Sequence, residues 1–116
     1  MTAASGGNLR TTITRDDDTI VVALVGDLDV YVANDARVHL DEAIDRAVSH
    51  SVPRVFVDAT GLTFCDSTGL AVLVQAQTAA ERRGVQLSVG NPSEPLLDLL
   101  HLTGLTALIG SGEEPS

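Results

Sequence analysis

The sequence predicts one small α/β domain, in which helices pack against a mixed β-sheet of about five strands. Its 116 residues fit a single domain. Hydrophobic residues make up 44% of the chain and charged residues 20%, so the chain can bury a core. Strand-like and helix-like segments follow one another in the order β-β-α-β-α-β-α-β, which predicts an opening antiparallel hairpin followed by parallel crossovers.

The first half of the chain contains the predicted hairpin and a helix. Residues 9–15 alternate and are rich in β-branched side chains, residues 16–18 predict a turn, and residues 19–26 predict a covered return strand. Residues 27–33 predict a loop that leads to Asn34, which we expect to cap the helix. Apolar residues lie on one helical face at Ala36, Leu40, Ala43, Ile44, Ala47 and Val48.

The second half predicts two more helices and three strands. Residues 54–59 predict a buried strand, and a helix is expected to begin at Gly69. Ser93 is expected to cap a short third helix, which stops at Gly104. The remaining expected strands lie at residues 85–90 and 106–110. We expect the domain to span residues 9–110, with a disordered tail at residues 1–8 and a polar tail at residues 111–116.

The charge and composition exclude several function classes. The net charge is −9 and the isoelectric point about 4.4, so phosphate-rich nucleic acids and anionic membranes are disfavoured partners. All cationic side chains other than histidine are arginine, which excludes a phosphate-binding P-loop and Schiff-base chemistry. Cys65 is the single cysteine, and the N-terminus lacks a signal-peptide pattern. We therefore expect a soluble, cytoplasmic protein without a cofactor.

A polar cluster stands where a predicted strand passes into a predicted helix. Asp66, Ser67, Thr68 and Gly69 follow an apolar strand and begin an apolar-periodic segment. The first turn of a helix exposes unpaired N–H groups and a partial positive charge. A hydroxyl at this position either caps the helix or accepts a phosphate that the same groups stabilise. Capping is the more common use, so the tetrapeptide alone leaves both interpretations open.

Two longer segments resemble known family motifs in the same order. RVFVDATGLTFCDSTGL at residues 54–70 is similar to a strand-and-turn signature of the type VVLDLSGVTFIDSSGL. LVGDLDVYVANDAR at residues 24–37 resembles a GELD loop, with Asp27 in place of the usual Glu. Both motifs are typical of the STAS family, and specifically of its anti-sigma factor antagonists. The resemblance covers about Leu9 to Ile109 and implies a STAS-like fold.

The resemblance also implies a regulatory cycle. Its phosphoacceptor position falls on Ser67, with Thr68 less favoured and expected to cap or pack. Asp29 matches a residue near the phosphorylation site and the partner. The implied partners are an anti-sigma factor with serine-kinase activity, which the unphosphorylated form binds to release a sigma factor, and a phosphoserine phosphatase. The expected partner-binding residues are Asp27, Asp29, Asp66, Ser67, Thr68 and Gly69.

Two departures and two rival interpretations complete the prediction. The last amphipathic helix of the family is expected to be short or missing here, and Cys65 replaces an aliphatic residue, so we expect it to be buried. An enzyme is disfavoured because CDSTG is not the G-x-S-x-G elbow and no residues share a metal-ligand spacing. We therefore predict no catalytic and no metal-binding residues. The alternative is a STAS scaffold subunit of a stress-signalling complex or a lipid-transport system.

Overall fold

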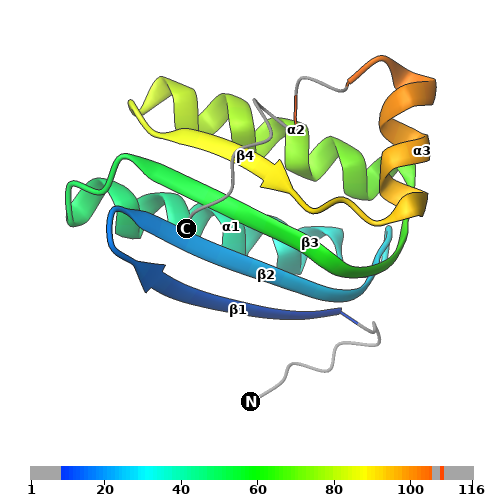
Figure 1. The fold of residues 1–116 in the computed structure, drawn as a ribbon, viewed down its shortest axis with the longest axis horizontal. Helices are drawn as coiled ribbons and strands as arrows, with labels where there is room; N and C mark the ends of the chain where they lie inside the picture. Colours follow the sequence, from blue (N-terminus) through cyan, green and yellow to red (C-terminus); the bar gives the residue numbers. More distant parts are fainter. Residues whose placement is uncertain (1–8, 106–107, 109–116) are drawn as a thin grey trace.

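Residues 9–105 and 108, which the computed structural model describes, form a four-stranded β-sheet with three helices (Figure 1). The strands lie in the order β1-β2-β3-β4. The mixed α/β class predicted from the alternating segments is therefore confirmed. The elements are β1 (Leu9–Asp16), β2 (Thr19–Leu28), α1 (Ala33–Ser49), β3 (Arg54–Cys65), α2 (Ser67–Arg82), β4 (Gln86–Gly90) and α3 (Glu94–Thr103).

The connections place two helices on one face of the sheet. β1 and β2 pair antiparallel, whereas β2, β3 and β4 are parallel neighbours. Each parallel crossover carries a helix back across the sheet, and both α1 and α2 lie behind it in the view of Figure 1. The helix α3 stands beside the carboxyl ends of β3 and β4. Because β2 and β3 are parallel, the segments that follow them emerge at the same end of the sheet, here called the carboxyl end.

The core lies between the sheet and the α1–α2 layer. Alternate residues of β2 and β3 point to this face, as the period of two in a strand requires. They meet the apolar stripes of both helices, and the cluster is aliphatic, in agreement with the low aromatic content. Its central members include Val22, Leu24, Leu40, Ile44, Val57, Leu73, Leu87 and Val89.

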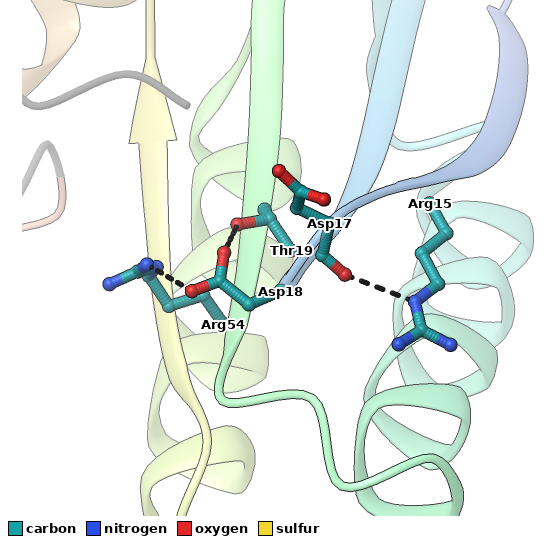
Figure 2. A network of polar contacts seen from close by, with 5 residues as sticks. All are labelled: Arg15, Asp17, Asp18, Thr19 and Arg54. Atoms are coloured by element: carbon teal, nitrogen blue, oxygen red, sulfur yellow. Dashed lines mark hydrogen bonds and ion pairs between the residues drawn. The ribbon is translucent and has the colours of Figure 1, made fainter. Parts of the chain in front are cut away.

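The hairpin at the opposite end of the sheet is held by polar contacts (Figure 2). Asp17 adopts a φ of 56°, a left-handed conformation that Asp tolerates well, and its carbonyl accepts a hydrogen bond of 3.1 Å from Arg15. The carboxylate of Asp18 pairs with Arg54 at 2.8 Å and accepts a bond from Thr19. The hydrogen bond from Arg54 holds the pKa of Asp18 below its usual value. This exposed ion pair ties the hairpin to the first residue of β3.

A bulge lengthens β3 beyond its predicted end. Asp58 pairs with Ala23, but the next pair joins Gly61 to Val25, so β3 holds one extra residue at this point. The Asp58 carboxylate accepts bonds from the amide and hydroxyl of Thr60 at 3.0 and 2.6 Å, and from Asn91 at 3.4 Å. Burial acts to raise the pKa of Asp58, but these bonds outweigh it and the pKa is lowered.

Three local predictions need correction. The predicted strand at 54–59 extends to Cys65, because β2 also extends and pairs with it to Leu28. The first helix begins at Ala33 with Val32 at the capping position, so Asn34 is not the cap. The hydroxyl of Ser93 makes no capping bond to α3, although the residue occupies the predicted position. The pairing with β2 explains the first difference, and the turn closed by the bond from the Val32 amide to the Asp29 carbonyl explains the second.

Several predictions fall on residues that the structure does not describe. The tails at residues 1–8 and 111–116 lie outside the described part. The predicted fifth strand at 106–110 does too, except for Leu108, whose amide donates to the carbonyl of Leu105 at 3.1 Å. The segment after residue 108, where the family's last helix is expected to be short or missing, also lies outside the described residues.

Gly90→Ala is expected to destabilise the fold by about 1–3 kcal/mol, as overpacking does in a filled core. A methyl group at Gly90 would overlap the ring of Phe56, which is only 6% exposed and has little room to move. Chemical denaturation followed by circular dichroism measures the change. In a Phe56→Leu background the same substitution should cost less, and equal costs in both backgrounds would contradict this account.

Candidate functional site at the carboxyl end of the sheet

The two predicted motifs meet where β2 and β3 end. Leu28 pairs with Cys65 in the last register position, and the amide of Asp66 donates to the carbonyl of Leu28 at 3.2 Å. The loop at 29–32 therefore starts beside the turn at 66–69, here called the Ser67 turn. Segments about 36 residues apart in the sequence become neighbours because the strands that carry them are parallel.

The carboxylate of Asp66 joins these two segments. Its Oδ1 accepts a hydrogen bond of 2.9 Å from the amide of Gly69, which makes Asp66 the N-cap of α2. Its Oδ2 accepts a bond of 3.2 Å from the amide of Val30 in the neighbouring loop. One side chain therefore caps the helix and holds the loop against the helix N-terminus.

Capping by Asp66 leaves both hydroxyls of the turn available. Ser67 and Thr68 occupy the first two positions of α2, and both are exposed. Within the described residues neither hydroxyl has a hydrogen-bond partner. We expected Thr68 to cap or pack, but the structure gives the cap to Asp66 and leaves Thr68 at the surface. The amides of Ser67 and Thr68 precede the first intrahelical bond, and within residues 9–105 and 108 they have no acceptor at the helix start.

Gly69 allows the helix to approach the end of β2. A Cβ at this position would collide with the carbonyl oxygen of Leu28 and with its side chain. The backbone of α2 therefore lies against the backbone of β2 at a distance that only glycine permits. Gly69 is buried, so it shapes the turn by close packing and does not itself line the outer surface.

Asp29 and Asp27 both lie at this end of the sheet. The Oδ1 of Asp29 accepts a hydrogen bond of 3.0 Å from the amide of Tyr31, and its carbonyl accepts one of 3.2 Å from Val32. These bonds form the turn that starts α1. The carboxylate of Asp27 accepts a bond of 2.7 Å from the hydroxyl of Thr63 in β3. The six residues predicted to bind a partner thus come from two segments that the fold brings together.

Three exposed apolar side chains at this end were missed by the sequence interpretation. Val30 is 57% exposed, Tyr31 78% and Phe64 48%. The chain has only three aromatic residues, and two of them are in this set. The rarity of aromatic residues, together with the positions of Tyr31 and Phe64 inside the two motif segments, is the signal that could have identified them from sequence.

Cys65 is buried beside the Ser67 turn. Burial, and to a lesser extent the nearby charge of Asp66, raises the pKa of its thiol to about 12. The thiol is therefore protonated at neutral pH and lacks the thiolate that nucleophilic chemistry needs. This agrees with the expectation of a small buried apolar side chain.

Three further observations across the described residues concern metal ligands, histidines and membrane spans. Across residues 9–105 and 108 no three His, Cys, Asp or Glu side chains are grouped so that they could hold a metal ion. His39 and His50 each lie within hydrogen-bond distance of a carbonyl of their own helix, at 2.8 and 2.9 Å. No helix in the described part of the chain is long and apolar enough to cross a membrane.

Comparison with known proteins matches both the sequence and the fold. The family model described as Mlab, STAS domain, matches residues 11–110. The anti-sigma-B factor antagonist of Listeria monocytogenes is 32% identical over 82% of this chain and 80% of that protein. The anti-sigma F factor antagonist of Paenibacillus polymyxa is 28% identical over 84% and 81%. The anti-sigma factor antagonist SpoIIAA in its unphosphorylated form has a similar fold, with a TM-score of 0.67 and 22% identity over 83% of this chain and 82% of that chain. The chain belongs to the STAS-domain family, among its anti-sigma factor antagonists.

Proposed function

We propose that the chain is an anti-sigma factor antagonist whose activity is switched by phosphorylation of Ser67. The unphosphorylated form binds an anti-sigma factor that is also a serine kinase, and this binding releases the sigma factor. The kinase transfers the γ-phosphoryl group of ATP to the hydroxyl oxygen of Ser67, whose proton is released. The phosphorylated form then loses its partner, and a phosphoserine phosphatase restores the binding form. The chain is the substrate in this cycle, which we place in the cytoplasm.

One observation makes Ser67 available as a phosphoacceptor, and the family's motif position selects it over Thr68, whose hydroxyl is equally exposed. Its hydroxyl is exposed at the first position of α2, while the capping role is filled by Asp66. A side chain that is not needed to hold the turn can be modified without loss of a structural bond. The unpaired amides at the helix start and its partial positive charge also favour a phosphate there. The family's phosphoacceptor position, directly after the aspartate, supports the same residue.

The loop at 29–32 and the Ser67 turn are proposed to form one binding surface. The Asp66 carboxylate bonds to both segments, so a partner that contacts the turn also meets Asp29. We propose that a phosphate at Ser67 blocks this surface directly. It adds about −1.5 to −2 charges and considerable bulk beside Asp66, opposite the nucleotide phosphates that a kinase holds near its substrate.

The alternative is a STAS scaffold subunit of a stress-signalling complex or lipid-transport system, in which the same fold and phosphoacceptor position recur. Genes for a kinase beside this one would favour the switch, and genes for a transporter would favour the scaffold.

Ser67 is expected to carry one phosphate after incubation with ATP and an anti-sigma serine kinase of the source organism. Each kinase is purified and tested separately, and peptide mass spectrometry locates the modification. Ser67→Ala should abolish the signal, whereas Thr68→Ala should retain it. A phosphate found only on Thr68, or none with any of the kinases, would overturn the assignment.

Ser67→Asp is expected to bind the kinase at least about tenfold more weakly than the wild type, because it places a carboxylate at the proposed contact. Ser67→Ala should bind as tightly as the wild type and should stay bound in the presence of ATP. Calorimetry measures both affinities. Amide shifts on phosphorylation should cluster at residues 27–29 and 66–71, and equal affinity of Ser67→Asp and the wild type would rule out a direct block.

Asp29→Asn is expected to weaken kinase binding with little change in thermal unfolding. The amide oxygen can still accept the bond from Tyr31, so only the charge is lost. Asp29→Ala removes the bond as well and should cost about 0.5–1.5 kcal/mol of stability. Asp17→Asn, in the hairpin at the other end of the sheet, is the charge-matched control. Unchanged affinity of Asp29→Asn would show that the partner does not use this charge.

A further inference from the structure

We propose that Val30, Tyr31 and Phe64 form an apolar anchor that fills an apolar pocket, rimmed by arginine or lysine, on the anti-sigma partner. Tyr31 is its main contact. This inference rests on the proposed function, because it assigns the surface around Ser67 to that partner. It adds residues that the family motifs do not mark and a chemical description of the surface that receives them.

Two of these side chains are aromatic, in a chain that contains only three aromatic residues. Its third aromatic residue, Phe56, is only 6% exposed, whereas Tyr31 is 78% and Phe64 48% exposed. Large exposed apolar side chains that gather at one place mark interaction sites more often than scattered ones do. Tyrosine is also among the residues that contribute most to binding at protein interfaces.

The anchor is held in place by the turn that carries it. The amide of Tyr31 bonds to the carboxylate of Asp29, and the amide of Val30 bonds to that of Asp66. Phe64 lies in β3, where it pairs with Asp27. The backbone of the anchor is therefore ordered before a partner arrives, which reduces the entropy lost on binding. Tyr31 itself has only two side-chain torsions to restrict.

The charges around the anchor indicate the charge of the partner surface that receives it. Asp27, Asp29 and Asp66 lie in the same two segments as the anchor, and neither residues 24–36 nor residues 60–72 contain a cationic side chain. The arginines of the neighbouring elements are Arg37, which bonds to Asn34 in α1, and Arg10, which pairs with Val25. A complementary surface therefore has an apolar centre and a basic rim, the arrangement in which polar groups surround a dry contact. A second copy of this chain would bring the same acidic side chains, and an anionic lipid surface would bring more negative charge, so neither complements the anchor.

The anchor also strengthens the proposed switch. When the partner covers the apolar side chains, water leaves the space next to Ser67. A phosphate at Ser67 adds bulk and tightly held water beside Asp66, so the partner can no longer pack closely against these side chains. With apolar side chains next to Ser67, phosphorylation therefore weakens partner binding more than it would if those side chains were polar.

The test measures the affinity of variants for the kinase that phosphorylates Ser67. Tyr31→Ala is expected to weaken binding at least about tenfold, and Phe64→Ala by a smaller factor, while Tyr31→Phe retains affinity within about threefold. Val48→Ala is the control, since Val48 is an exposed apolar residue of the last turn of α1, at the opposite end of the sheet. Thermal unfolding of each variant should match the wild type, because these side chains are exposed.

The possible outcomes separate this inference from the proposed function. If a kinase binds and phosphorylates the wild type, and Tyr31→Ala and Phe64→Ala bind it with the same affinity, the proposed anchor is wrong but the proposed phosphorylation switch is unaffected. If no kinase binds the wild type, both are wrong. Analytical ultracentrifugation tests self-association, and a dimer that Tyr31→Ala dissociates would assign the anchor to a second copy and overturn the proposal.

Discussion

The structure at the carboxyl end of the sheet depends on the two hydrogen bonds that the carboxylate of Asp66 accepts. One oxygen caps α2 through Gly69, and the other holds the loop at 29–32 through Val30. In both bonds a backbone amide donates to a carboxylate, and such hydrogen bonds are stronger than those between two neutral groups. Without this side chain the helix would lack its cap, and the loop that carries Asp29 and Tyr31 would lose its link to the Ser67 turn.

The two bonds of Asp66 require a short distance between α2 and β2, and Gly69 supplies it. Its missing Cβ lets the helix start against the carbonyl of Leu28. Two register shifts in β3, one after Asp58 and one between Leu62 and Phe64, contribute from the other side, because together they bring Cys65 opposite Leu28. Local backbone features in three separate segments thus converge on one turn. The same packing buries Cys65 and keeps its thiol protonated.

The order of strands and helices could be predicted from sequence because each element carries its own periodicity. The Ser67 turn and the loop at 29–32 could be located because they follow adjacent parallel strands. The choice of cap could not be predicted: Asp, Ser and Thr are all favoured caps, and only the approach of β2 selects Asp66 over Thr68. The exposure of Tyr31 was not predicted, since VYV is as typical of a buried strand as of a loop, and only the rarity of aromatic residues in this chain marks it.

The proposed switch depends on how capping and modification are divided between neighbouring residues. If Ser67 were the cap, its hydroxyl would be bonded to a backbone amide, and phosphorylation would first have to break that bond. With Asp66 as the cap, the hydroxyl is exposed, and a phosphate can join the helix start while the turn keeps its bonds. The modification then changes the charge and hydration of a surface that is otherwise preserved. An acidic, partly apolar surface is sensitive to such a change, because the new charge lies where a partner would exclude water.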